Sequence, residues 1–164
     1  MSTADAITVE LVASATDDVR ILVGELDQIL SAEYPPEQRH GLALDAIFKP
    51  NIRFFLARLN GAAVGCGGVA LFADFAEVKR MYVRDTVRRR GVAQALLARM
   101  ERTTRDASLV LLRLETGVRQ TAALRFYQRA GFQPCAAFGG YATMRPQAVA
   151  TSVFLEKRLA GPAK

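Results

Sequence analysis

The chain has 164 residues, 51% of them hydrophobic, with two cysteines, one histidine and a formal net charge of +6. This length predicts a single domain over residues 1–164, with enough apolar residues for one core, which argues against disorder. The apolar runs are too short to cross a bilayer and the N-terminus does not resemble a secretion signal, so we expect a cytoplasmic protein without a membrane partner. Cys66, Cys135 and His40 lack metal-ligand spacing, and no metal site is expected.

The position of the excess charge indicates what kind of anion the protein binds. Residues 77–105 contain nine basic and three acidic residues, whereas the rest of the chain contains 13 of each. A groove that follows a nucleic acid would spread its basic residues more widely. Their confinement therefore favours one compact polyanionic ligand and argues against a nucleic-acid partner.

The N-terminal part of the chain predicts a short strand followed by two helices. Residues 8–12 have strand character, and residues 17–30 place their apolar side chains on one helical stripe, with Thr16 or Asp17 as the N-cap. A second helix is expected from Pro36 to about residue 47, because proline suits a first helical turn.

Three strands are expected next. Residues 53–59 and 62–71 are separated by Asn60-Gly61, which is the strongest short signal for a hairpin. Residues 76–83 continue this antiparallel series after a turn near Asp74.

The segment after residue 83 changes from a strand pattern to a helix pattern across a basic turn. The expected helix spans residues 88–105, and Val92, Leu96 and Met100 recur at helical spacing. The first backbone N–H groups of a helix have no internal partner, and the helix dipole adds positive charge there. Because Gly91 and Ala93 are small, this turn predicts an anion site for phosphate groups.

The C-terminal part predicts a buried strand at residues 109–114 and a helix at residues 120–130 that ends at Gly131. The last strands are expected at residues 132–138 and 152–159, with an exposed connection over residues 139–147.

Two motifs in this order resemble the GNAT superfamily of acyl-CoA-dependent N-acetyltransferases. The first is Arg88-Arg89-Arg90-Gly91-Val92-Ala93, and the second runs from Ala123 through Tyr127 to Gly131-Phe132. Together they cover roughly residues 77–132 and are specific in combination. The resemblance implies an α+β fold, with a mixed, mostly antiparallel central sheet of about seven strands and helices on both faces. It also implies transfer of the acetyl group of acetyl-CoA to a primary amine.

The resemblance assigns the coenzyme to the basic turn and the strand before it. Backbone N–H groups of the turn would hold the pyrophosphate, and the pantetheine arm would lie along the backbone of Met81 and Val83 like an additional strand. Gln120 stands where many members have asparagine. The expected coenzyme-binding residues are Met81, Tyr82, Val83, Arg88, Arg89, Arg90, Gly91, Val92, Ala93, Gln94, Gln120 and Ala123.

Two residues are candidates for proton transfer. Glu77 would accept the proton of the attacking amine, with Glu115, Glu33 and Glu37 as reserves; the alternative is a surface carboxylate paired with Lys79 or Arg80. Strict alternation places Glu77, Lys79, Met81 and Val83 on one face, although a bulge would break it. Tyr127 matches the family's general acid for the departing thiolate; the alternative is a core tyrosine bonded to the backbone.

The acceptor is the least determined part of the prediction. Residues that fall where the family builds its acceptor site are Tyr34, Phe48, Phe72, Tyr141 and Arg145, and the sequence favours a surface position for His40. A small amine or amino acid is expected rather than a protein, although a peptide acceptor also fits, and homodimers are common in the family. The alternative function is a non-catalytic sensor or adaptor that binds acyl-CoA.

Overall fold

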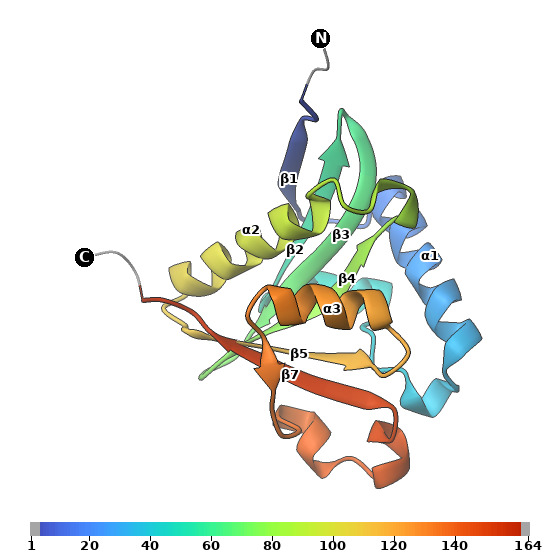
Figure 1. The fold of residues 1–164 in the computed structure, drawn as a ribbon, viewed down its shortest axis with the longest axis vertical. Helices are drawn as coiled ribbons and strands as arrows, with labels where there is room; N and C mark the ends of the chain where they lie inside the picture. The colour runs from blue at the N-terminus through green and yellow to red at the C-terminus, as the bar shows by residue number, and fades with distance from the viewer. Residues whose placement is uncertain (1–3, 162–164) are drawn as a thin grey trace.

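One mixed, mostly antiparallel sheet of seven strands forms the centre of the computed structural model, which describes residues 4–161 (Figure 1). The strand order is β1-β2-β3-β4-β5-β7-β6, and within these residues only the β4–β5 pair is parallel. The strands are β1 (Ile7–Val12), β2 (Ile52–Leu59), β3 (Ala62–Leu71), β4 (Ala76–Val83), β5 (Leu111–Gly117), β6 (Gln133–Pro134) and β7 (Ser152–Arg158). The predicted fold class is confirmed.

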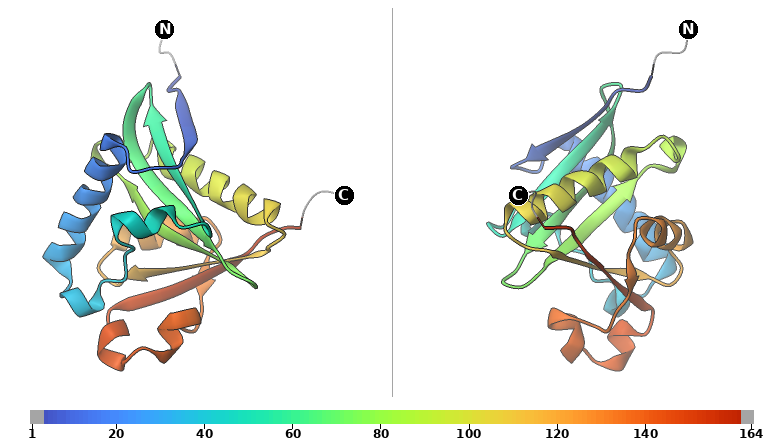
Figure 2. Two further views of the ribbon diagram at one scale, coloured as in Figure 1. Left: turned by 180° about the vertical axis from the view of Figure 1, so that it is seen from behind. Right: turned by 60° about the vertical axis from the view of Figure 1, so that its left-hand side comes forward.

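Helices cover both faces of the sheet. The helix α1 (Asp17–Glu33) and the 3-10 helix Leu44–Phe48 lie on one face, whereas α2 (Val92–Asp106) and α3 (Thr121–Arg129) lie on the other (Figure 2). No helix in residues 4–161 is long and apolar enough to cross a membrane.

Each face of the sheet buries its own hydrophobic cluster. Phe54 and Phe55 are neighbours on β2, both 1% exposed, and they belong to different clusters because successive strand side chains point to opposite faces. Phe55 packs in the larger cluster under α2 and α3, and Phe54 packs in the smaller one under α1. Burial on both sides explains why β2 has an almost continuous run of apolar residues.

Several local signals act as the sequence predicts. The Thr16 hydroxyl accepts a hydrogen bond of 3.3 Å from the N–H of Val19 and so caps α1. Asn60 and Gly61 both have positive φ, as a type I′ hairpin turn requires. Gly131 has a φ of 100° and follows the C-cap Ala130 of α3, which identifies it as the C′ glycine that ends the helix.

The helix expected over residues 36–47 is absent. Only the 3-10 helices Pro36–Gln38 and Leu44–Phe48 form, and the chain between them runs over the side chain of Arg80. A Cβ atom at Gly41 would lie 2.0 Å from Nη1 of Arg80, so the backbone approaches this guanidinium as closely as glycine allows. Tertiary packing thus overrides the helical pattern.

The strand expected over residues 132–138 is also wrong in extent. It is only the two residues of β6, followed by one further backbone bond from Cys135 to Phe154. Phe138 leaves the sheet to pack against Phe75, Tyr141 and Phe154. The connection over residues 139–147 contains the 3-10 helix Gly139–Thr143 and the start of another, Pro146–Val149.

Two further boundaries differ from the prediction. The strand expected over residues 109–114 begins and ends later, as β5, because the N–H of Leu109 still bonds the carbonyl of Thr104 at the end of α2. The helix expected from residue 88 begins at Val92, so Arg88 to Gly91 form the turn in front of α2.

Candidate active site

The strands β4 and β5 pair only at their first residues and then part. Ala76 pairs with Leu112 and Glu77 with Arg113, and the described chain has no further pairing between these two strands. Both strands nevertheless continue, β4 to Val83 and β5 to Gly117. The facing edges therefore present backbone groups that an extended ligand can pair with as an additional strand.

A bulge in β4 changes which side chains face α1. Arg80 has a φ of 55°, and the register with β3 shifts between Cys66 and Gly68. Val78 packs in the cluster under α2 and α3, and so do Met81 and Val83, whereas Tyr82 packs in the cluster under α1. Of the two possibilities that the sequence left open, the bulge is the one observed, and it breaks strict alternation after Lys79.

The residues of β4 that carry charge all lie on the α1 face as a result. Arg80 bonds the backbone carbonyl of Val23 and forms an ion pair with Asp27, and both partners are on α1. Glu77 and Lys79 alternate with Val78 and so point to this same face.

Backbone N–H groups gather in the turn before α2. The first hydrogen bond of this helix runs from the N–H of Ala95 to the carbonyl of Gly91, at 3.0 Å. Arg89 and Gly91 both have positive φ, and Gly91 provides no side-chain cap. Within the described residues, the six consecutive N–H groups from Arg89 to Gln94 have no hydrogen-bond partner. A concave run of free N–H groups is a site for an oxyanion.

The three arginines of this turn are not equivalent. Arg90 binds Asp5 with its Nη2 at 2.6 Å from Oδ1, and this bond lowers the pKa of Asp5. Arg88 and Arg89 are exposed and form no ion pair with the described part of the chain. They are therefore the two guanidinium groups free to meet a ligand at the N–H groups.

A cavity of about 560 Å³ continues from this turn between α2 and α3. Arg89 and Gln94 form its wall at the turn, and Phe126, Arg129 and Lys157 contribute aromatic and basic side chains further along. Its volume is within the range of small-molecule sites. Glu101 also lines the cavity and pairs with Lys157 at 3.0 Å, so Arg89 and Arg129 are the basic side chains of the lining that form no ion pair with a described residue.

Tyr127 on α3 is buried, at 4% exposure, and its ring packs against Phe126 and Phe132. Its hydroxyl has no hydrogen-bond partner in the structure as described, so the alternative of a core tyrosine bonded to the backbone is not what is observed. Burial raises the pKa of Tyr127 above its ordinary value of 10.0. The phenol therefore stays protonated at neutral pH and can donate.

Ionisable side chains on the α1 face form the Glu77 cluster, defined as Glu77, Lys79, Glu115 and Tyr141. Oε2 of Glu77 lies 2.8 Å from Nζ of Lys79 and accepts a hydrogen bond of 2.7 Å from the hydroxyl of Tyr141. Nζ of Lys79 also donates to that hydroxyl, at 2.9 Å. Glu77 is only 4% exposed. The alternative of a surface carboxylate paired with Lys79 is therefore right about the partner but not about the surface position.

Glu115 on β5 belongs to the same cluster from the other side of the parted strands. Burial raises the pKa of Glu115, while a hydrogen bond of 2.6 Å from Ser152 and the nearby charges of His40 and Lys79 oppose the shift. In residues 4–161, no group of three or more His, Cys, Asp and Glu side chains is placed to hold a metal ion.

The surface position favoured for His40 is wrong. Its Nε2 lies 2.6 Å from the carbonyl oxygen of Ala148, and its ring meets the edge of Tyr141 with centroids 5.6 Å apart. His40 is half-buried and touches the Glu77 cluster through Tyr141. These partners lie about a hundred residues away in the sequence, which is why no local pattern indicated them.

Other candidate residues are distributed more widely. Gln120 stands directly before α3 and accepts a hydrogen bond of 2.8 Å from Tyr34, which also bonds the N–H of Arg119. Ala123 packs against the larger core cluster. Of the reserves for the base, Glu37 is exposed, and Glu33 lies at the end of α1.

The aromatic residues expected near the acceptor do not all meet. Tyr141 joins the Glu77 cluster, whereas Phe48 packs on Phe54 and Phe72 is 43% exposed beside Phe75. Arg145 is exposed.

Comparison with known proteins agrees with this geometry. The Acetyltransferase (GNAT) family matches residues 23–132. An IAA acetyltransferase of Azospirillum brasilense is 39% identical over 155 residues, which are 93% of this chain and 98% of that protein. An aminoalkylphosphonate N-acetyltransferase of Salmonella typhimurium is 28% identical over 76% of this chain and 84% of that protein.

A solved structure shares the fold. The PaiA N-acetyltransferase of Thermoplasma acidophilum, in complex with coenzyme A, has a TM-score of 0.67 at 15% identity and covers 93% of this chain and 99% of that one. The chain belongs to the GNAT family of acetyltransferases.

Proposed function

We propose that the protein transfers the acetyl group of acetyl-CoA directly to a primary amine in a ternary complex. The observation that carries this proposal is the run of six free N–H groups beside Arg88 and Arg89, placed next to the parting of β4 and β5. A pyrophosphate needs such donors, and an amide-rich pantetheine arm needs an unpaired strand edge. Family membership supplies the acetyl donor.

The coenzyme would use three surfaces in sequence. The pyrophosphate binds the N–H groups from Arg89 to Gln94, and the adenosine part lies in the cavity between α2 and α3. The pantetheine arm follows the edge of β4 at Met81 and Val83. The thioester would then lie between Tyr127 on one side of the sheet and the Glu77 cluster on the other.

The chemistry requires one proton to leave and one to arrive. The amine nitrogen attacks the thioester carbonyl carbon, the C–N bond forms, and the C–S bond breaks. We propose that Glu77 accepts the proton of the amine and that the Tyr127 hydroxyl donates its proton to the departing sulfur. Solvent returns the tyrosine proton, and the products are an N-acetylated amine and coenzyme A.

Thiol release from acetyl-CoA tests this function. Purified protein is assayed with a panel of small amines, amino acids and a lysine-containing peptide, each compared with the rate of thioester hydrolysis in its absence. We expect coenzyme A to appear above background with at least one small amine. Binding of coenzyme A without release across the whole panel would instead identify a non-catalytic acyl-CoA-binding module.

Glu77→Gln tests the base. Because an alkyl amine has a pKa of about 10 and is mostly protonated at neutral pH, we expect kcat/KM at pH 7 to fall about 100-fold in this variant. The deficit should shrink as the pH rises and the acceptor loses its proton without help. The measurement is the pH profile of kcat/KM for both proteins.

Glu115→Gln is the matched comparison, since it removes the other carboxylate of the cluster. Burial raises the pKa of Glu115. At a pH above this raised pKa, the ionised carboxylate therefore lowers the free energy of unfolding, whereas at a pH well below the unfolded value of 4.5 it has no such effect. The variant should therefore unfold at a higher temperature than the wild type at pH 8, with the difference vanishing in acid. A larger loss of activity in Glu115→Gln than in Glu77→Gln would contradict the role of Glu77.

A further inference from the structure

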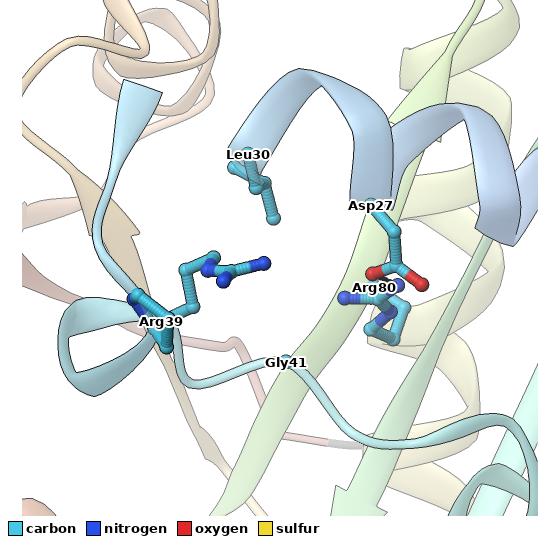
Figure 3. Close-up of a pocket in the computed structure, with 6 residues that line it drawn as sticks. Asp27, Leu30, Arg39, Gly41 and Arg80 are labelled. Carbon is cyan, nitrogen blue, oxygen red and sulfur yellow. Dashed lines mark hydrogen bonds and ion pairs between the residues drawn. The ribbon is translucent and has the colours of Figure 1, made fainter. Parts of the chain in front are cut away.

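A second cavity, of about 240 Å³, lies between α1 and the chain that follows it (Figure 3). Asp27 and Leu30 of α1 line one side, Pro36, Arg39 and Gly41 line the other, and the bulge residue Arg80 of β4 closes it. The coenzyme surfaces described above share no lining residue with this cavity.

The cavity contains more positive than negative charge. The Arg80 side chain is 3% exposed and is paired with Asp27, but its Nε is buried without a partner. Arg39 extends from its loop toward the middle of the cavity, and its Nε is likewise buried without a partner. Arg39 forms no ion pair with any described residue. Two guanidinium groups thus face one carboxylate.

Such an arrangement is costly without a ligand. The buried Nε–H groups of Arg39 and Arg80 have lost hydration that no described residue replaces. Arginine presents its donors in a planar fork that matches the oxygens of a carboxylate or phosphonate. The close approach of Gly41 to Arg80 holds one of the two forks in place. The chemistry of the lining therefore selects an oxyanion.

The cavity is directly beside the Glu77 cluster. Arg39 and Gly41 line the cavity, whereas His40 between them meets Tyr141 of the cluster. In the same way Arg80 lines the cavity, whereas its neighbour Lys79 binds Glu77. At both positions the residue that lines the cavity is thus a direct chain neighbour of the residue that contacts or belongs to the cluster.

We propose that this cavity binds the anionic group of the acceptor, so that the substrate is a small amine that also has a carboxylate or phosphonate. The inference rests on the proposed acetyl transfer and adds the class of acceptor to it. The oxyanion lies between Arg39 and Arg80, and the amine reaches toward Glu77. The volume of about 240 Å³ suits a compact anionic group.

Matched acceptors test the substrate class. β-Alanine is compared with β-alaninamide, and 2-aminoethylphosphonate with its diethyl ester, with each rate expressed per concentration of neutral amine to remove differences in amine pKa. We expect kcat/KM to be at least about tenfold higher for the anionic member of a pair, the ratio that one charge-assisted hydrogen bond provides. The carboxylate and phosphonate arms show which oxyanion is preferred.

Substitution of Arg39 tests the site. Arg39→Gln should lower kcat/KM for the preferred anionic acceptor about 10- to 100-fold and change that for its neutral partner less than about threefold. Arg39→Lys, which keeps the charge, should recover part of the loss. Arg20→Gln is the control, because Arg20 is an exposed arginine on α1 outside the cavity and its loss changes the net charge equally.

A binding measurement separates this inference from the acetyl transfer. Protein saturated with coenzyme A, so that the turn before α2 is occupied, is heated with millimolar methylphosphonate or acetate and with sodium chloride at equal ionic strength. We expect either oxyanion to raise the unfolding temperature of the wild type and of Arg20→Gln, but not that of Arg39→Gln.

The outcomes are distinct. Turnover that is equal for both members of every pair, with Arg39→Gln affecting both alike, overturns the anionic acceptor and leaves the acetyltransferase intact. Absence of turnover with every amine overturns the proposed function. The unfolding temperature then tests the anion site independently. If neither methylphosphonate nor acetate raises it, the anion site is overturned as well.

Discussion

Replacement of Tyr127 with phenylalanine should lower kcat about 100-fold, the lower end of what a general acid contributes, and leave the Kd for coenzyme A unchanged. The thiolate of coenzyme A is a moderately basic leaving group, so it departs faster when a proton reaches the sulfur. The hydroxyl of Tyr127 is the part removed, and the turn that we propose binds the pyrophosphate lies elsewhere, before α2. Steady-state kinetics and a direct binding titration measure the two quantities.

Stability distinguishes this role from a structural one. Since the Tyr127 hydroxyl has no partner within residues 4–161, Tyr127→Phe should not lower the free energy of unfolding. Tyr34→Phe is the comparison, because the Tyr34 hydroxyl bonds both Gln120 and the N–H of Arg119. It should cost about 1–3 kcal/mol. An unchanged kcat in Tyr127→Phe would remove the residue from the acid role.

The pH profile of the wild type provides a second check. Burial raises the pKa of Tyr127 above 10.0, so the phenol should remain a donor throughout the range in which the acceptor amine loses its proton. No fall in kcat from this residue is therefore expected below pH 10. A descending limb near pH 8 that disappears in Tyr127→Phe would contradict this environment.

The free N–H groups of the turn before α2 were predictable because their signals are local. A basic segment, a glycine and a change from strand to helix spacing all occur within a few residues, and the free N–H groups follow from the start of any helix. The hairpin at Asn60-Gly61 is predictable for the same reason, since its two residues tolerate positive φ.

The Glu77 cluster and its surroundings depend on contacts between residues far apart in the sequence, which no local pattern contains. Glu77 meets Tyr141 across 64 residues, and His40 meets Ala148 across 108. The bulge has a positive φ at an arginine, where sequence gives no reason to expect it. Its backbone conformation is held by the bonds of Arg80 to Val23 and Asp27 on α1, so the fold determines the bulge.

Gly91→Leu should raise the Kd for coenzyme A about 100-fold, which corresponds to the loss of one or two charge-assisted hydrogen bonds. A leucine at this position brings a side chain to the N–H groups from Arg89 to Gln94 and blocks close approach of the pyrophosphate. The φ of 89° also disfavours any residue with a Cβ. Isothermal titration with coenzyme A measures the effect, and kcat at saturating acetyl-CoA should fall much less.

Gly61→Leu separates backbone strain from blockage of the site. Gly61 has a φ of 90°, and no atom lies within 4 Å of a Cβ placed there; at Gly91 the nearest is Cδ1 of Ile7 at 3.5 Å. A leucine therefore fits sterically at either position. The positive φ strains the backbone by about 1–3 kcal/mol in each case, so the free energy of unfolding should fall by a similar amount in both variants. Only Gly91→Leu should lose coenzyme affinity, because only Gly91 belongs to the run of free N–H groups. Equal weakening of coenzyme binding by the two variants would mean that strain, and not the anion site, governs the affinity.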